Sequence, residues 1–287
     1  MIAITGAGGK TGRAITRALA ARGAAVRAWV RADAHAAALK DAGAAQVVTG
    51  DLRAPAALHN ALDGARAVYH ICPNVHPDEA VIGQAVLAAA RAAGVEQFVF
   101  HSVLHPQTEA MPHHWQKLRV EAALFESRLP FTILQTAPYM QNTLAGLGAV
   151  RANGVFQVPY PVETCLSLVD LDDVAEAAAR VLTEPGHAGA TYELVGTPGL
   201  TQTVVAAELG RALGRDVRAE CEPVEAWKQR ARAAGLGDYQ VVTLLAMFSY
   251  YARCGLWGSP SVLTWLLGRA PTTLAAFAAR VAGERAA

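Results

Sequence analysis

The sequence predicts an α/β protein built on a doubly wound, mainly parallel sheet, followed by a smaller and mostly helical C-terminal lobe. Three observations support this fold class. Short apolar segments alternate with segments of helical period over the first 136 residues, a pattern typical of a parallel sheet covered on both faces. The first apolar segment runs directly into a glycine-rich turn. From Thr201 onward the pattern is mainly helical, which indicates the separate lobe.

The strands of this sheet are expected at 2–5, 25–30, 46–49, 67–71, 97–101 and 131–135, with a further strand at 191–195. Helices are expected at 10–22, 33–42, 55–62, 78–93, 113–127, 139–152 and 172–182. A segment marked by glycine and proline predicts an excursion from the sheet near 154–164. We therefore expect a domain over 1–196 and a substrate-binding lobe over 197–287, with one short strand at 217–221.

Composition excludes several classes of protein. Of the 287 residues, 53% are hydrophobic and only 17% are charged, which excludes an intrinsically disordered chain. The formal net charge of +1 gives no overall field that attracts nucleic acid or anionic lipid. The segment 241–268 is the best membrane candidate, but Arg253 divides it into pieces too short to span a bilayer. We expect neither direct nucleic-acid binding nor a membrane.

The cysteines and the N-terminus favour the cytoplasm. The cysteines lie dozens of residues apart without a CxxC pair, and they are Cys72, Cys165, Cys221 and Cys254. The sequence opens without the basic and apolar regions of an export signal. Histidines at 101, 105, 113 and 114 lack a paired cysteine or carboxylate at ligand spacing, so we expect no metal site.

The glycine-rich turn has the features of a phosphate-binding loop. Glycines at 6, 9 and 12 follow the first strand and open the first helix. The first glycine permits a tight turn, the second lets backbone N–H groups approach a pyrophosphate, and the third allows close packing of helix on strand. The spacing is GxxGxxG, and it is not a Walker A loop. The expected cofactor-binding residues are Gly6, Ala7, Gly8, Gly9, Lys10, Thr11 and Gly12.

The end of the second strand indicates which dinucleotide binds. An acidic residue there would hold the ribose hydroxyls of NAD, but Arg31 follows the strand instead. A guanidinium suits a 2′-phosphate, and Lys10 supplies a second positive charge in the loop. We therefore expect NADP(H) to be preferred over NAD(H). Asp33 is the competing residue, because its carboxylate would favour the ribose of NAD.

Several further motifs, in their order and spacing, resemble the NmrA-like branch of the atypical short-chain dehydrogenase/reductases, which have a Rossmann fold. The resemblance covers nearly the whole chain. It rests on the loop at 6–12 and on the segments 50–52, 98–102, 113–117, 133–142, 169–175 and 268–274. It implies that Asp51 and Leu52 lie by the adenine and that Cys72 and Pro73 border the cofactor. It also implies that Tyr139 and Asn142 approach the nicotinamide and the substrate, beneath a C-terminal lobe.

The chain departs from the family at its catalytic motif. The family's Tyr-x-x-x-Lys is replaced here by His113 and Lys117, which share one helical face. The resemblance implies that Lys117 binds the nicotinamide ribose and that Ser102 corresponds loosely to the family's serine. An imidazole at position 113 can donate a proton, but a cationic neighbour favours its neutral form. The candidate catalytic residues are His113, Lys117 and Ser102, and His113 also contacts substrate.

The missing tyrosine favours acceptors that need little acid catalysis. Hydride transfer to a quinone or an azo dye gives a stabilised anion that solvent can protonate. The aromatic residues between 247 and 266 either line a flat substrate pocket through Tyr251 and Trp257 or pack the core of the lobe. The sequence thus predicts an NADP(H)-dependent reductase of quinone-like acceptors, as a monomer or homodimer. The alternative is a non-catalytic redox sensor that acts through protein partners.

Overall fold

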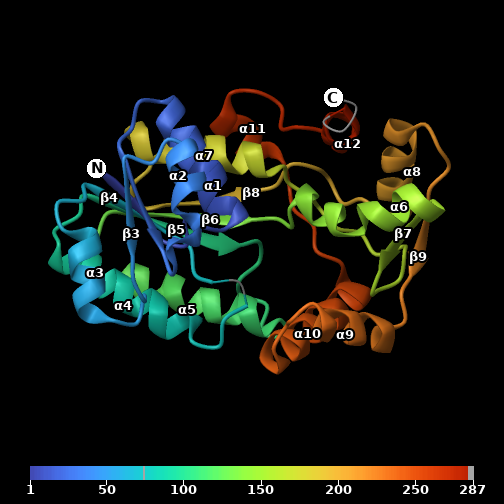
Figure 1. Ribbon diagram of the computed structural model, residues 1–287, viewed down its shortest axis with the longest axis horizontal. Helices are drawn as coiled ribbons and strands as arrows, with labels where there is room; N and C mark the ends of the chain where they lie inside the picture. Colours follow the sequence, from blue (N-terminus) through green and yellow to red (C-terminus); the bar gives the residue numbers. More distant parts are fainter. Residues whose placement is uncertain (74, 284–287) are drawn as a thin grey trace. The chain divides into compact units, whose positions relative to one another are not determined.

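The computed structural model describes residues 1–73 and 75–283, and a seven-stranded sheet forms its centre (Figure 1). The strand order is β3-β2-β1-β4-β5-β6-β8, and β1 pairs in parallel with both β2 and β4. The strand order therefore reverses at β1, which is where such sheets bind ligands. The strands are β1 (Ile2–Ile4), β2 (Val26–Val30), β3 (Gln46–Thr49), β4 (Ala67–His70), β5 (Gln97–Val103), β6 (Phe131–Thr136) and β8 (Ala190–Leu194).

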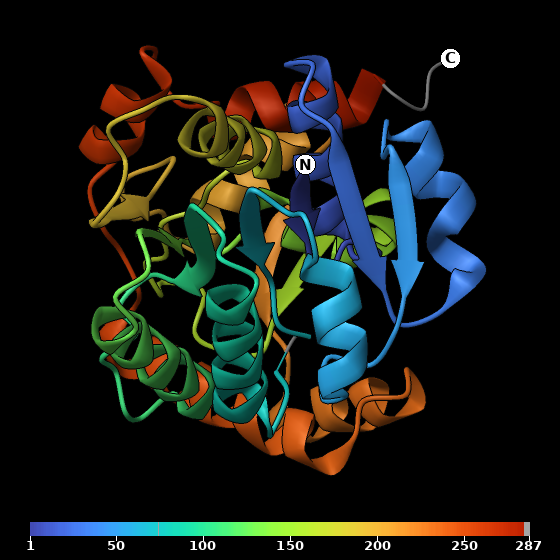
Figure 2. The same cartoon turned by 90° about the vertical axis from the view of Figure 1, so that its left-hand side faces the viewer.

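Helices cover both faces of this sheet, as Figures 1 and 2 show. On one face lie α3 (Pro55–Leu62), α4 (Glu79–Ala92) and α5 (Pro112–Glu126). On the other lie α1 (Lys10–Ala21), α2 (Ala36–Asp41) and α7 (Leu171–Thr183), with a 3₁₀ turn η1 (Asp33–His35) before α2. The predicted doubly wound α/β fold is confirmed. The strands and helices expected up to residue 136 are all present, with ends shifted by a few residues.

The chain forms two compact units, and the expected division at residue 196 into a cofactor domain and a substrate lobe stays a prediction. The first unit contains 1–108, 113–135 and 174–192, and the second contains 109–112, 136–173 and 193–287. The segment 136–173 belongs to the second unit because β7 (Val155–Val158) pairs in parallel with β9 (Arg218–Cys221). The glycine- and proline-marked segment at 154–161 therefore contains a strand, in a two-stranded sheet of its own.

The second unit is mostly helical. Its helices before β9 are η2 (Met140–Gly146), α6 (Leu147–Asn153) and α8 (Gln202–Leu213). After β9 follow α9 (Val224–Ala233), α10 (Asp238–Cys254), α11 (Ser261–Leu267) and α12 (Leu274–Gly283). The helix expected at 139–152 is divided between η2 and α6, because the chain first forms a 3₁₀ turn. No helix among the described residues is long and apolar enough to cross a membrane.

Each unit has its own apolar core. In the first unit, side chains from α3, α4 and α5 pack on the sheet around the fully buried Phe98, Phe100 and Leu124. In the second unit, α6, α8 and α12 pack on the small sheet around Val150 and Phe277. Predicted site residues lie at the carboxyl ends of β1, β2, β4 and β5. These strand ends therefore belong to a sheet that is packed on a buried core.

Candidate active site

The glycine-rich loop after β1 has a shape that only glycine permits at two positions. Gly6 has a φ of +62°, and a Cβ there would lie 2.7 Å from the carbonyl oxygen of Ile71. A Cβ on Gly12 would lie 2.5 Å from the Cα of Ala7. Contacts this close to backbone atoms cannot be relieved by moving a side chain. These two glycines are therefore needed for the loop to fold.

Gly9 leaves room beside the loop for a ligand, and Gly8 leaves room for the side chain of His35. A Cβ on Gly9 would meet only the carbonyl oxygen of Gly6, at 3.6 Å, and Gly9 is the N-cap of α1. The N-terminus of a helix carries partial positive charge, which suits a phosphate. The space over Gly8 is filled by His35, whose Cδ2 would lie 2.7 Å from a Cβ there. The loop therefore fits the pyrophosphate of a dinucleotide at Gly9.

Arg31 is exposed at the carboxyl end of β2, as predicted. The competing carboxylate of Asp33 accepts a hydrogen bond from the hydroxyl of Thr49 in β3. Asp51 lies near Arg31 and binds the guanidinium of Arg53 at 2.7 Å; its hydrogen bonds with Arg53 lower its pKa to about 2. At this end of β2 and β3, the carboxylates of Asp33 and Asp51 thus already have partners, and the guanidinium of Arg31 is exposed.

The residues expected to border the cofactor differ in exposure. Leu52 is half-buried and packs against the core, whereas Pro73 is exposed. Cys72 is 5% exposed, and burial raises the pKa of its thiol, so the thiol stays protonated at neutral pH. Cys72 would therefore border the cofactor as a protonated, unreactive side chain.

Lys117 lies on the inner face of α5, in a buried ion pair. Its Nζ is 2.5 Å from Oε1 of Glu79 in α4 and donates to the carbonyl oxygen of His101 in β5 at 3.3 Å. The two side chains are 12% and 2% exposed. The ammonium is therefore fixed between a carboxylate and a carbonyl.

His113 is neutral at physiological pH. Burial, with the nearby His114 and the Lys117 ammonium, lowers its pKa to about 3. Its ring packs edge-on against that of His114 with 4.5 Å between centroids, and its buried Nδ1 has no hydrogen-bond partner among the described residues. The expectation that a cationic neighbour favours the neutral imidazole agrees with this environment. His113 can offer a hydrogen bond, but it holds no extra proton near pH 7.

Ser102 is fully buried and donates its hydroxyl hydrogen to Oε1 of Glu121 in α5. Gln135 of β6 donates to both oxygens of the same carboxylate, at 3.1 and 3.0 Å. Burial raises the pKa of Glu121, although these hydrogen bonds act in the opposite direction. The catalytic role of Ser102 stays a prediction, and in this structure the hydroxyl has a protein partner.

Tyr139 and Asn142 belong to the second unit, at the start of η2. The backbone of this segment pairs with 169, since Met140 donates its N–H to the carbonyl of Val169 at 2.9 Å. The neighbouring Gln141 donates to the buried carboxylate of Asp170 at 2.6 Å. Tyr139 is half-buried and Asn142 is exposed, so both remain accessible on a segment with a fixed backbone.

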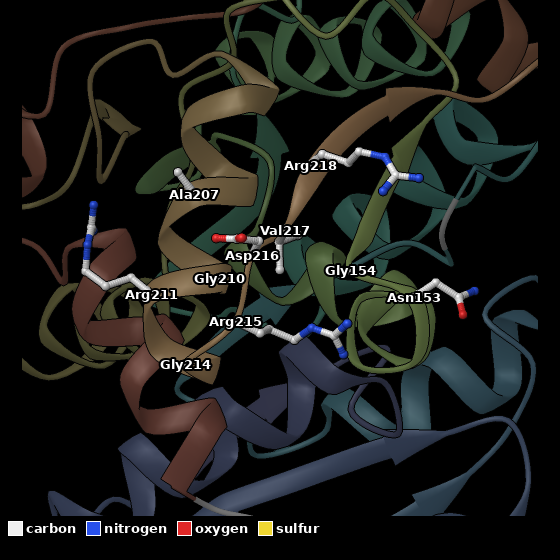
Figure 3. Close-up of a pocket in the computed structure, with 10 residues that line it drawn as sticks. All are labelled: Asn153, Gly154, Ala207, Gly210, Arg211, Gly214, Arg215, Asp216, Val217 and Arg218. Carbon is white, nitrogen blue, oxygen red and sulfur yellow. The ribbon is translucent and has the colours of Figure 1, made fainter.

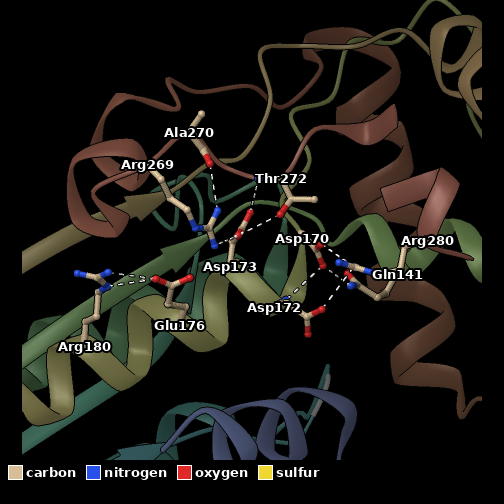
Figure 4. A network of polar contacts seen from close by, with 10 residues as sticks. All are labelled: Gln141, Asp170, Asp172, Asp173, Glu176, Arg180, Arg269, Ala270, Thr272 and Arg280. Carbon is tan, nitrogen blue, oxygen red and sulfur yellow. Dashed lines mark hydrogen bonds and ion pairs between the residues drawn. The ribbon is translucent and has the colours of Figure 1, made fainter. Parts of the chain in front are cut away.

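Two buried carboxylates fix the chain around that segment (Figure 4). Asp170 binds Arg280 of α12 at 2.6 Å. Asp173 binds Arg269 at 2.7 Å and accepts the backbone N–H of Thr272 at 2.6 Å. Both carboxylates are 0% exposed, so these contacts replace the water that the charges lose. The segments 169–175 and 268–274 both resemble family motifs, and these contacts join them.

The aromatic residues predicted to line a substrate pocket divide into two kinds. Tyr251 is 5% exposed and packs edge-on against Tyr160, with 5.8 Å between centroids, which is core packing. Trp257 is 62% exposed, and its neighbours are held by backbone bonds such as Leu256 N–H to the carbonyl of Cys165 at 3.0 Å. Only Trp257 has the exposure that a ligand contact requires.

A separate open pocket of about 690 Å³ lies in the second unit, between the end of α8 and β9 (Figure 3). Arg211 points to one side of the pocket and Arg215 and Arg218 point to the other (Figure 3). Two of the three already bind glutamates: Arg211 binds Glu208, and Arg218 binds Glu220 at 2.6 Å. The pocket thus lacks convergent charge. No group of three or more potential metal ligands gathers in the described part of the chain.

Sequence reasoning missed the partners of the α5 residues. Glu79 lies on α4 and binds Lys117, and Gln135 lies on β6 and binds Glu121 of α5. Glu79, Gln135 and Glu121 belong to different elements, so no local motif joins them. One signal was available, because Glu121 lies four residues after Lys117 and eight after His113 and therefore shares their helical face.

Comparison with known proteins agrees with this geometry. The model of the NmrA-like family matches residues 1–277. The NAD(P)H azoreductase of Xenophilus azovorans is 31% identical, over 97% of this chain and 96% of its own. Quinone oxidoreductase 2 of Escherichia coli strain K12 is 32% identical, over 96% of both chains. The crystal structure of an NADPH-dependent quinone oxidoreductase from E. coli with NADPH superposes with a TM-score of 0.85 at 31% identity, covering 98% of this chain and 99% of that one.

Proposed function

Because the chain belongs to the NmrA-like family, we propose that it is an NAD(P)H-dependent reductase that transfers hydride to a small electrophilic acceptor of the quinone or azo type. The observation that carries the proposal is the loop after β1. Gly6 and Gly12 have no room for a side chain, whereas Gly9 is open at the N-terminus of α1. This is the arrangement that a dinucleotide pyrophosphate requires.

The preferred cofactor is NADP(H). Arg31 is exposed at the end of β2, and the carboxylate of Asp33 is engaged by Thr49. A guanidinium binds a phosphate through paired, charge-assisted hydrogen bonds. The 2′-phosphate therefore has a cationic partner at the position where an NAD-specific site places an acid.

The α5 face orients the reaction. When bound, the reduced nicotinamide supplies the hydride. Lys117, fixed by Glu79, holds positive charge beside the site, and neutral His113 offers a hydrogen bond to the acceptor. The low pKa of His113 favours acceptors whose reduced form is a stabilised anion, because water then supplies the proton.

The residues proposed to contact the acceptor are Tyr139, Asn142 and Trp257. Tyr139 and Asn142 are accessible on a fixed segment, and Trp257 is the most exposed of the predicted aromatic contacts. An exposed indole suits a flat aromatic acceptor. Burial of Tyr251 supports a packing role for that residue instead.

Steady-state oxidation of NADPH and NADH with a panel of quinones and azo dyes tests the proposal. We expect turnover with at least one acceptor and a higher kcat/KM with NADPH than with NADH. Tight NADPH binding without turnover on any acceptor would remove the reductase, and a preference for NADH would remove the assignment to Arg31.

The second candidate is a redox sensor whose affinity for a protein partner depends on NADP(H). It is favoured by the ion pair of Lys117 with Glu79 and by the buried hydroxyl of Ser102, since both groups already have protein partners. A pull-down with NADP⁺, NADPH or no cofactor tests it, and equal partner recovery in all three would exclude it. For either function we propose a monomer or homodimer. We propose the cytoplasm as its location, because three exposed free thiols suit a reducing compartment.

A further inference from the structure

The inner face of α5 carries a row of three polar side chains, His113, Lys117 and Glu121, at intervals of four residues. Such spacing places them one above another on the helix. Lys117 reaches the carbonyl of His101 and Glu121 accepts the hydroxyl of Ser102, so two successive residues of β5 bind two successive turns of α5. Two such anchors fix both the rotation and the axial position of the helix.

Glu121 has the larger share of these contacts. It is 4% exposed and accepts from Ser102 of β5 and from Gln135 of β6, whose residues are 0% and 9% exposed. Removal of the carboxylate would take from the buried amide of Gln135 both of its acceptor oxygens, which is costly, and would break the bond from Ser102 to α5. Without the bonds of Glu121 to β5 and β6, α5 would shift or rotate.

His113 depends on this anchoring. Its Nδ1 is buried without a partner among the described residues, and its ring is held by packing against His114. The direction of the imidazole is therefore set by the helix that carries it. Lys117 would keep Glu79 if Glu121 were removed, so its charge would remain compensated.

We propose that Glu121 is a positioning residue of the reductase, which acts through Ser102 and Gln135 to fix α5 and thereby the placement of His113. The inference rests on the proposed function. Ser102 has the same role in it, as the β5 side of the anchor. Displacement of a reacting group by about 1 Å costs on the order of a hundredfold in rate.

The variant Glu121→Leu removes the acceptor. We expect kcat for NADPH oxidation with a quinone to fall by about tenfold to a hundredfold, while the Kd for NADPH, set at the phosphate loop, changes by less than about threefold. The double variant Glu121→Gln with Gln135→Glu exchanges acceptor and donor, and we expect it to restore kcat to within about threefold of wild type. If Glu121→Leu fails to fold, Glu121→Gln alone is compared with the exchange.

Leu124→Ala is the matched control, since Leu124 is fully buried on the same helix but makes no polar anchor. It should lower Tm with kcat within about threefold of wild type. The proposal is overturned if folded Glu121→Leu keeps its kcat, if NADPH affinity falls as much as kcat, or if Leu124→Ala loses kcat equally.

A spectroscopic measurement separates this inference from the proposed function. The imidazole NMR signals of His113, assigned with a His113→Gln variant, should move in Glu121→Leu, return in the exchanged pair and stay in place in Leu124→Ala. If the wild type turns over no acceptor, the proposed function fails and these signals still decide the inference. Unchanged His113 signals in Glu121→Leu overturn it.

Discussion

The phosphate loop and the inner face of α5 are both parts of the proposed reductase site, but they are built differently. The loop is shaped within residues 6–12, with one close contact from Ile71 and one from His35. The α5 face depends on Glu79, Ser102 and Gln135, which lie 38, 19 and 14 residues from their partners. The loop is therefore a local structure, whereas the α5 face exists only once the sheet has formed.

This difference predicts how each region fails. Substitutions in the loop should change cofactor binding through steric conflict at single positions. Substitutions on the α5 face should act through buried groups left without partners, and they should respond to pH and to compensating changes.

The largest expected effect is that of pH on the stability of the first unit. Burial lowers the pKa of His70, His101 and His113 to about 3 and that of His114 to about 4. The unfolded chain binds protons below about pH 6.5, and the folded chain does not bind them at these sites until near pH 3 to 4. Stability is therefore complete above pH 6.5 and falls as the pH drops, on the order of 1.4 kcal/mol per pH unit for each histidine.

Urea unfolding at pH 7.5, 5.5 and 4.5 checks this dependence. The raised pKa of Glu121 acts in the opposite direction, because the folded state then binds a proton more tightly than the unfolded one. His114→Gln should reduce the change in unfolding free energy per pH unit. An equal pH dependence in that variant would contradict the lowered pKa of His114.

The next effect separates structural from chemical roles of Lys117. Lys117→Met leaves the Glu79 carboxylate buried without its cation, which should cost about 3–5 kcal/mol of folding stability. The double variant with Glu79→Gln should recover most of that loss. If the double variant also recovers kcat, Lys117 is structural only, whereas stable protein with low kcat supports a role at the site.

The glycines of the loop give a matched pair of smaller changes. Gly12→Ala should destabilise the protein by about 1–3 kcal/mol or more, because its Cβ meets backbone atoms at 2.5 and 2.7 Å. Gly9→Ala should leave Tm nearly unchanged and weaken NADPH binding, because the methyl group occupies only the space proposed for the pyrophosphate. Thermal unfolding and fluorescence titration of NADPH measure the two effects. Equal behaviour of the two variants would contradict the assignment of Gly9.

Arg31→Ala is expected to act on one cofactor alone. The loss of a charge-assisted contact of about 1.5–3 kcal/mol corresponds to a tenfold to hundredfold weaker Kd for NADPH. NADH lacks the 2′-phosphate and should be nearly unaffected. Calorimetric titration of both cofactors against wild type and variant decides the matter, and a parallel loss for both would make Arg31 a structural residue.

The same contrast explains what the sequence could predict. The alternation of apolar and helical segments specified the sheet, and the positions of Gly6 and Gly12 specified the loop, because these patterns are local. The strand at 155–158 was not predicted, since its partner lies more than 60 residues away at 218–221. Glu79 and Gln135 were not predicted for the same reason, and the burial of Ser102 and Tyr251 depends on packing that periodicity does not reveal.

A single-turnover experiment shows whether the bound cofactor passes its hydride to an acceptor. Wild-type protein saturated with NADPH is mixed in a stopped-flow instrument with one equivalent of a quinone or an azo dye. We expect the absorbance of NADPH and the colour of the acceptor to fall together at one rate, and this rate to be lower in Glu121→Leu and restored in the exchanged pair. Unchanged NADPH absorbance, in protein shown by titration to hold the cofactor, would contradict the reductase.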